Sequence, residues 1–198
     1  MAQFQVNGFA IVAAGGVGKE VVFSFAEAGA KGILLADIEY EAATKAAEAS
    51  KSLATDTDYR SLAIKVDVVD AQSVQRMVDL AIKEFGRIDY CINAAGVDVA
   101  EYVPFDETDP DDYDRILGIN TKNMFLVCRA VAKAMKQQEP AKVTLNRHGI
   151  LEKLAAVKRP LEPDEVASAC LYLCSPSAVY YNGATLTLDS GILVGPTL

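Results

Sequence analysis

Residues 9–38 constrain the fold more than any other stretch, because they have the pattern of strand, glycine turn, helix and strand in close succession. Residues 9–13 (FAIVA) form an apolar run that is long enough for a buried parallel strand and too short for a helix. The cluster at residues 14–18 (AGGVG) permits a tight turn and a close backbone approach to a ligand. Between residues 19 and 30 the apolar side chains fall on one helical face: Val21, Val22, Phe25 and Ala26.

The second buried strand, residues 32–37, ends in Asp37. Its distance from the glycine turn is close to the roughly 20 residues that separate glycines and acid in a dinucleotide-binding βαβ unit. In such a unit the pyrophosphate sits on the amide-rich helix start, and the acid accepts hydrogen bonds from ribose hydroxyls. A purely structural βαβ turn is the alternative interpretation. The residues that would approach the pyrophosphate are Gly15, Gly16, Val17 and Gly18.

The rest of the chain alternates between helical and strand patterns. The i, i+3, i+4 spacing of apolar residues is clearest over residues 71–85, and Gly86 ends that helix. This alternation predicts an α/β fold with a doubly wound, parallel, Rossmann-like sheet and right-handed crossovers. The predicted helices lie at 40–53, 71–85, 110–138 and 164–173, and the further strands at 61–66, 89–93 and 184–188.

Composition excludes several classes of protein. The 198 residues suit one domain, 51% of them are hydrophobic, and no run of eighteen apolar residues predicts a membrane span. No secretory signal is expected, because the N-terminus lacks a basic segment followed by an apolar one. The excess of 27 acidic over 19 basic residues disfavours nucleic acid or an anionic membrane as a partner. With His148 as the single histidine, no metal site is expected. Four cysteines without a CxxC pair are expected in the core of a reduced, cytoplasmic protein: Cys91, Cys128, Cys170 and Cys174.

These motifs together resemble the classical short-chain dehydrogenases/reductases over most of the chain. Residues 34–37 (LLAD) are similar to the acid-ended second strand of the family, which implies NAD(H) as cofactor because a carboxylate repels a 2′-phosphate. Residues 119–122 (INTK) resemble the segment whose asparagine, here Asn120, organises the proton-relay water. The resemblance further implies that the adenine contacts Asp67 and Val68, and that Asn93, Ala94 and Gly96 belong to the family's Asn-Asn-Ala-Gly motif, with Ala94 in place of the second asparagine.

The chain departs from the family in its opening glycine motif. Residues 11–18 (IVAAGGVG) keep the last Gly-x-Gly but lack the threonine and the first glycine, and the turn is about two residues short. A shortened loop would present fewer amides to the pyrophosphate, or present them at the wrong distance. NAD(H) is therefore the expected cofactor, if any, with a weakened affinity.

The second departure is the loss of the catalytic core. The family uses a serine to hold the substrate oxygen and a Tyr-x-x-x-Lys helix to move the proton. No tyrosine of this chain has a lysine four residues later, and no serine lies between Ser73 and Ser168. Residues 139–162 are also too few for the missing strand-helix-strand unit, which needs upwards of roughly 30 residues. An internal deletion explains these absences better than substitution does.

The deletion would remove the fifth and sixth strands and leave strand order 3-2-1-4. We expect a single Rossmann-like domain over residues 1–198, with a nucleotide-binding part at 1–138, an irregular segment at 139–162, and a C-terminal helix and strand at 163–198. The bare edge of the fourth strand would be covered by residues 184–188 or by a second chain, or else the region would stay poorly ordered. We favour the first of these. Any homo-oligomer is expected to form through the C-terminal helix and strand.

Three functional interpretations stay open at this point. The resemblance implies an ancestral NAD(H)-dependent oxidoreductase that acts on a small alcohol or ketone of unknown identity, without the usual serine, tyrosine and lysine. A non-redox cyclase, isomerase or aldolase could reuse the fold, with an acid or base from the acidic loop at 97–109 or from elsewhere. The third interpretation is an inactive homologue or a splice product. The candidate acids and bases are Asp98, Glu101, Tyr102 and His148.

Overall fold

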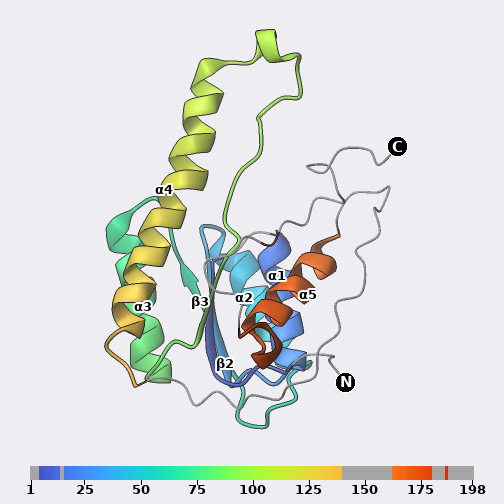
Figure 1. Cartoon of the computed structure of the whole chain (residues 1–198), viewed down its shortest axis with the longest axis vertical. Helices are drawn as coiled ribbons and strands as arrows, with labels where there is room; N and C mark the ends of the chain where they lie inside the picture. Colours follow the sequence, from blue (N-terminus) through green and yellow to red (C-terminus); the bar gives the residue numbers. More distant parts are fainter. Residues whose placement is uncertain (1–4, 14–15, 140–161, 180–185, 187–198) are drawn as a thin grey trace.

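The computed structural model describes residues 5–13, 16–139, 162–179 and 186. Its sheet has four parallel strands in the order β3-β2-β1-β4, which confirms the predicted order (Figure 1). The strands are β1 (Phe9–Ala13), β2 (Gly32–Asp37), β3 (Arg60–Lys65) and β4 (Tyr90–Asn93).

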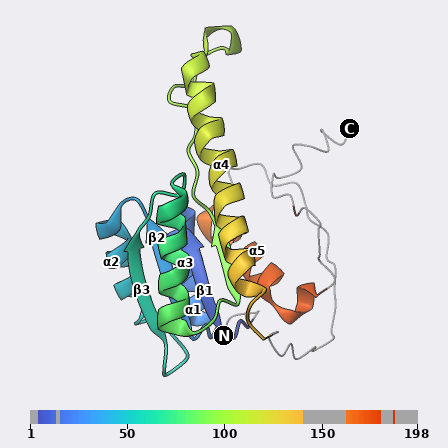
Figure 2. The ribbon, with the colours of Figure 1, turned by 90° about the vertical axis from the view of Figure 1, so that its left-hand side faces the viewer.

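Helices cover both faces of the sheet, as a doubly wound α/β fold requires (Figure 2). One face carries α1, α2 and α5, and the other carries α3 and α4. In the part of the chain that the structure describes, no helix is both long and apolar enough to cross a bilayer. The helices are α1 (Gly16–Glu27), α2 (Tyr40–Ser50), α3 (Ala71–Phe85), α4 (Pro110–Met135) and α5 (Pro163–Cys174), with short 3-10 turns η1 (Phe105–Glu107) and η2 (Pro176–Ala178).

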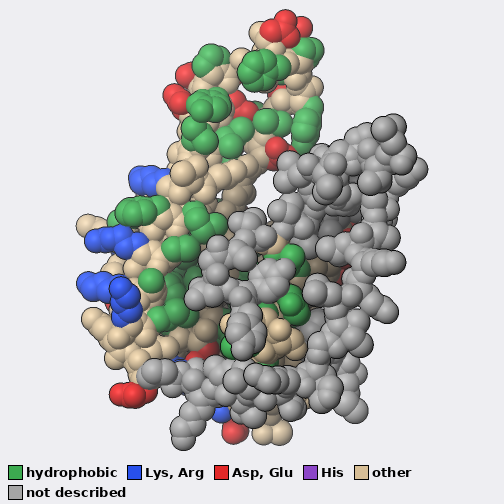
Figure 3. Space-filling model, viewed as in Figure 1, with side chains coloured by type: hydrophobic (Ala, Val, Ile, Leu, Met, Phe, Trp, Pro, Cys, Tyr) green, Lys and Arg blue, Asp and Glu red, His purple; other side chains and the backbone are tan. Residues whose placement is uncertain are grey.

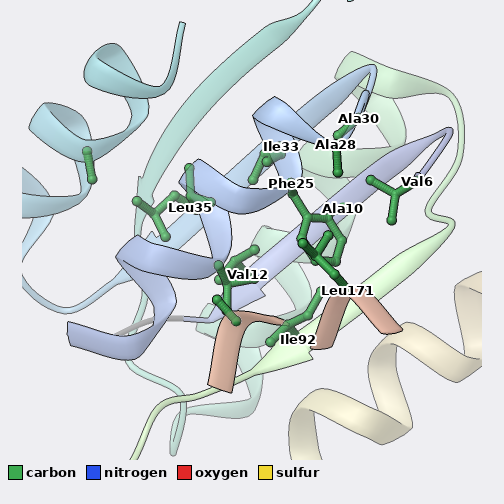
Figure 4. Close-up of a cluster of buried hydrophobic side chains, with 14 of the residues drawn as sticks. Val6, Ala10, Val12, Phe25, Ala28, Ala30, Ile33, Leu35, Ile92 and Leu171 are labelled. Carbon is green, nitrogen blue, oxygen red and sulfur yellow. The ribbon is translucent and has the colours of Figure 1, made fainter. Parts of the chain in front are cut away.

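The central strands are apolar on both faces, because successive side chains of a strand point to opposite sides. Val12 of β1 packs with Phe25 of α1 in one cluster (Figure 4). Its neighbour Ile11 packs with Met77 of α3 in the other cluster. All four of these side chains are fully buried. The uninterrupted apolar run at residues 9–13 is therefore what a strand sandwiched between two helical layers needs.

Helix α3 begins and ends at residues suited to those positions. Asp70 caps it, since its side chain accepts hydrogen bonds from the backbone N–H groups of Gln72 (3.0 Å) and Ser73 (3.1 Å). Gly86 ends it in a left-handed conformation (φ 79°), and its N–H donates to the carbonyl of Ile82. These two residues fix where the chain enters α3 and where it turns toward β4.

Strand β4 lies at the edge of the described sheet and pairs there with β1 alone. The predicted C-terminal strand at 184–188 falls outside the described residues except for Leu186, which is not in a strand. The predicted irregular segment at 139–162 lies outside them apart from its two end residues, and the division of the chain into parts stays a prediction. Helix α4 continues well beyond the sheet, so that its amino-terminal half projects from the body of the fold (Figures 1 and 2).

Candidate functional site

The carboxyl ends of the parallel strands meet at one edge of the sheet, and the predicted site residues gather there. Ala13, the last residue of β1, is in register with Ala36 of β2 and with Asn93 of β4. Asp37 follows Ala36 directly, in register with Lys65 of β3. Since neighbouring strands lie about 4.8 Å apart, Asp37 and Asn93 flank the end of β1 within reach of one extended ligand. Binding crevices of open α/β sheets occupy this position.

Helix α1 begins at this edge immediately after β1. Only Ala14 and Gly15, which lie outside the described residues, separate the end of β1 from the start of α1 at Gly16. No described residue lies within 4 Å of a Cβ placed on Gly16, so the described part of the chain leaves room beside the first residue of α1. Gly18 is buried in the first turn. The free N–H groups and positive end of this helix suit an anion such as a pyrophosphate.

The two predicted acidic residues lie at the carboxyl ends of β2 and β3. Asp37 is partly exposed, and its Oδ1 accepts a hydrogen bond from the backbone N–H of Glu39 (2.9 Å). Asp67 lies just after β3, where its Oδ1 accepts from the N–H of Val69 (3.0 Å). The next residue, Val68, packs partly against the cluster between the sheet and α3. Asp37 thus lies at the same edge of the sheet as the start of α1.

The residues after β4 are joined to α4 by a set of side-chain amides. Asn120 makes two hydrogen bonds with Val97: its Oδ1 accepts from the backbone N–H (2.8 Å) and its Nδ2 donates to the carbonyl (2.9 Å). Asn123, one turn further along α4, accepts from Asn93 Nδ2 (2.9 Å) and donates to the carbonyl of Ala95 (2.9 Å). The sequence motifs mark Asn120 and Asn93 but not Asn123. What distinguishes Asn123 is its full burial on a helix, and burial cannot be read from the sequence.

Gly96 allows α4 to approach this segment closely. A Cβ at position 96 would lie 3.2 Å from Asn120 Oδ1, which is tighter than an ordinary contact. Ala94 contributes no side-chain amide, but its N–H donates to the carbonyl of Ala13 (2.8 Å) and extends the pairing of β4 with β1. Ala94 and Gly96 of this motif therefore contribute through their backbone and their small size.

The acidic loop at residues 97–109 runs along the projecting part of α4. Arg115 of α4 donates to the carbonyl of Asp98 (2.6 Å) and pairs with Asp112 (2.6 Å). The Tyr102 hydroxyl donates a hydrogen bond to the Asp98 carboxylate. This bond, together with a second one from the Val99 N–H, lowers the pKa of Asp98. The same bond to Asp98 raises the pKa of Tyr102. Both shifts oppose acid-base catalysis near neutral pH, because they leave a weaker proton donor and a weaker base. Glu101 is exposed, and His148 lies outside the described residues.

The cysteines show no sign of redox chemistry. Burial raises the pKa of Cys91 to about 12, with Cys128 and Cys174 adding in the same direction, and burial raises the pKa of Cys174 to about 12. These thiols stay protonated at neutral pH. The expectation that all four lie in the core is wrong for Cys128, which is exposed because Val127 beside it takes the inward position on α4. No cluster of metal-ligating side chains occurs among the described residues.

The comparison with protein families is decisive. A model of the short chain dehydrogenase family matches residues 9–145. The chain belongs to the short-chain dehydrogenase family. A second model, described as enoyl-(acyl carrier protein) reductase, matches residues 146–193. The change from one model to the other falls inside the segment at 139–162, where the sequence predicts the deletion.

Individual relatives agree with this assignment. The short-chain dehydrogenase anuF of Penicillium roqueforti is 37% identical over 179 residues, which cover 89% of this chain and 63% of that protein. An NAD⁺-bound xylitol dehydrogenase has a TM-score of 0.58 and 29% identity over 68% of this chain and 50% of the other. The chain spans between about half and two thirds of the curated relatives that it matches with the highest scores.

A third relative bears on the missing segment. The D-threitol dehydrogenase of Mycolicibacterium smegmatis is 28% identical over an alignment of 242 residues, which covers 92% of this chain and 90% of that protein. Because this alignment is longer than the chain of 198 residues, it contains gaps opposite residues of the relative. An internal deletion has this consequence, whereas substitution of the catalytic residues alone would not.

Proposed function

We propose that this short-chain dehydrogenase family member binds NAD(H) along the carboxyl edge of β2, β1 and β4, and that it lacks the proton-transfer groups of its relatives. The observation that carries the proposal is the register of the strands, which brings Asp37, the start of α1 and Asn93 to one edge. The room that the described residues leave beside Gly16 supports it, since a ligand can come close to the backbone there.

Each part of the site has a defined task in this proposal. The N–H groups at Gly16, Val17 and Gly18 would hold the pyrophosphate at the positive end of α1. The carboxylate of Asp37 would accept hydrogen bonds from the adenosine ribose and repel a 2′-phosphate, which favours NAD(H) over NADP(H). Asp67 and Val68 would border the adenine. When bound, the nicotinamide supplies hydride donor or acceptor chemistry; the protein supplies position and electrostatics.

The residues of this chain do not support the family's usual proton transfer. Both polar atoms of the Asn120 side chain are engaged with the backbone of Val97, so this residue acts here as a clamp on the segment after β4. The sequence contains no Tyr-x-x-x-Lys and no serine between Ser73 and Ser168. General acid-base catalysis contributes about 10²–10⁴-fold, and its loss predicts hydride transfer at a small fraction of the rate of an intact enzyme. No observation favours the non-redox alternative.

The first test is a titration with NADH followed by its fluorescence, together with an assay for turnover of simple ketones and alcohols. We expect saturable binding and little or no turnover. Asp37→Ser should weaken NADH binding about tenfold, because a hydrogen bond to a charged group contributes about 1.5–3 kcal/mol and 1.4 kcal/mol is tenfold in Kd. The same variant should bind NADPH more tightly. Absence of NADH binding by the wild-type protein would refute the proposal.

Self-association through the C-terminal helix and strand is proposed as well. On α5 and just after η2, Leu173 (42%) and Val179 (48%) are exposed apolar side chains. The alternative contact is the exposed side of α4, where Leu117, Met124 and Phe125 are exposed and apolar side chains gather on the surface (Figure 3). Sedimentation of Leu173→Asp and Phe125→Asp separates the two. We expect Leu173→Asp to dissociate the oligomer and Phe125→Asp to leave it intact.

A further inference from the structure

The side chain of Asn123 joins α4 to the end of β4 through both its oxygen and its nitrogen. It is completely buried, its Oδ1 accepts from Asn93 Nδ2 (2.9 Å), and its Nδ2 donates to the carbonyl of Ala95 (2.9 Å). A buried side chain with both ends engaged has one orientation, because turning it over would set like groups against each other. The segment from Asn93 to Ala95 is therefore held at two points from within α4.

This contact also decides how the carboxamide of Asn93 is turned. Its nitrogen faces Asn123 Oδ1, and it lies 3.8 Å from the sulfur of Met124. Its oxygen is buried and has no hydrogen-bond partner among the described residues. Buried acceptors in native proteins nearly always have a donor, from the protein, from water or from a ligand. Asn93 Oδ1, at the carboxyl end of β4 and next to the end of β1, is thus an acceptor that no described residue satisfies.

We propose that Asn123 is a positioning residue of the dinucleotide site. It turns the carboxamide of Asn93 so that Oδ1 accepts a hydrogen bond from a hydroxyl or amide N–H of the bound cofactor. It also holds the backbone of Ala95 beside the carboxamide of Asn93. The inference rests on the proposed function, since it assigns a partner to the NAD(H) that the chain is proposed to bind. It deepens that function by naming a second residue of α4, besides Asn120, on which the shape of the site depends.

A second carboxamide, that of Gln138, makes a contact similar to that of Asn123 but lies away from the proposed site. Gln138, three residues beyond the end of α4, accepts from the backbone N–H of Ile88 (3.1 Å) and donates to its carbonyl (2.5 Å). Ile88 precedes β4, at the opposite end of the strand from Asn93. The same chemistry therefore fastens both ends of β4 to the α4 region, and only one of the two ends faces the proposed site. A merely structural role would make the two carboxamides equivalent.

The experiment compares Asn123→Leu with Gln138→Leu in the full chain. Both variants lose a carboxamide that bonds to the segment around β4, fully buried at Asn123 and partly buried at Gln138, and we expect both to lower the melting temperature. Only Asn123→Leu should weaken NADH binding, by about tenfold, whereas Gln138→Leu should bind within about twofold of wild type. Amide hydrogen exchange should speed up at residues 93–97 in the first variant and around Ile88 in the second. Equal NADH affinity in the two variants would overturn the inference.

Two further measurements keep the outcome decisive. If Asn123→Leu does not fold, Asn93→Ala removes the acceptor itself while Asn123 remains in place, and it should also weaken NADH binding about tenfold. An unchanged affinity in Asn93→Ala would overturn the inference. A wild-type protein that binds no NADH would refute the proposed function, and the inference with it. Binding by wild type with no loss in the Asn93 and Asn123 variants would refute the inference alone.

Discussion

Substitution of Gly96 by alanine tests whether the segment after β4 is in close contact with α4. The added Cβ would lie 3.2 Å from Asn120 Oδ1 and 3.6 Å from its Cγ, where ordinary contacts are 3.4–4 Å, so the amide must move back by a few tenths of an ångström. That movement stretches the bond from the Val97 N–H to Asn120 Oδ1, now 2.8 Å. Loss of such a bond costs about 0.5–1.5 kcal/mol.

An opposing effect nearly cancels this loss in stability. Replacing glycine by alanine lowers the entropy of the unfolded chain, which stabilises a compatible fold by about 0.4–1 kcal/mol. The net change for Gly96→Ala is thus within about 1 kcal/mol, or less than about 4 °C in Tm for a chain of this size. Gly118→Ala in α4 is the matched control, because a Cβ there meets no atom within 4 Å. It should gain about 0.5–1 kcal/mol and raise Tm by about 1–4 °C.

Thermal unfolding and amide hydrogen exchange together give the answer. We expect Gly118→Ala to melt above wild type and Gly96→Ala to melt below Gly118→Ala. Exchange of the Val97 amide should speed up in Gly96→Ala alone. If Gly96→Ala is stabilised as much as Gly118→Ala and the Val97 amide exchanges as in wild type, the close approach of Gly96 to Asn120 does not hold the segment after β4 in place.

Three other outcomes follow from packing, capping and thiol burial. Phe25→Ala should lower the free energy of unfolding by about 3–5 kcal/mol in a denaturant titration, because the ring is fully buried between α1 and the sheet. Asp70→Ala should cost about 1 kcal/mol in the same assay, since both hydrogen bonds that cap α3 are lost. In the native protein at pH 8, a maleimide should label the exposed Cys128 first. Burial raises the pKa values of Cys91 and Cys174 to about 12, so these thiols hold almost no thiolate until the pH approaches that value. Mass spectrometry identifies the labelled residue.

The sheet was predictable from the sequence because its pattern is local. The apolar run at residues 9–13, the acid at Asp37 and the helical spacing over residues 71–85 each depend on neighbours within one element. The order β3-β2-β1-β4 then followed from the resemblance to the family. Helix ends were less accurate, since the pattern predicts α2 to residue 53 and the structure ends it at Ser50.

The contacts that shape the site were not predictable in this way. Asn123 meets Asn93 across 30 residues of sequence, and Gln138 meets Ile88 across 50. A polar residue on a helix is normally exposed, so the sequence alone suggests a solvated side chain. The motif residues Asn93 and Asn120 were found only because a family pattern marks them, and the same pattern carries no mark for Asn123.

The two carboxamide clamps also bear on the order in which the chain can assemble. The contact between Gln138 and Ile88 closes a loop of 50 residues that contains all of β4 and α4. Closing a long loop is entropically costly and happens late unless local contacts prepare it. On a ribosome, β4 can therefore line up with β1 early, but both ends of the strand become fastened only after residue 138 has emerged. Until then the amino end of β4 lacks its contact with Gln138, so this end of the strand is the last part of it to become fixed.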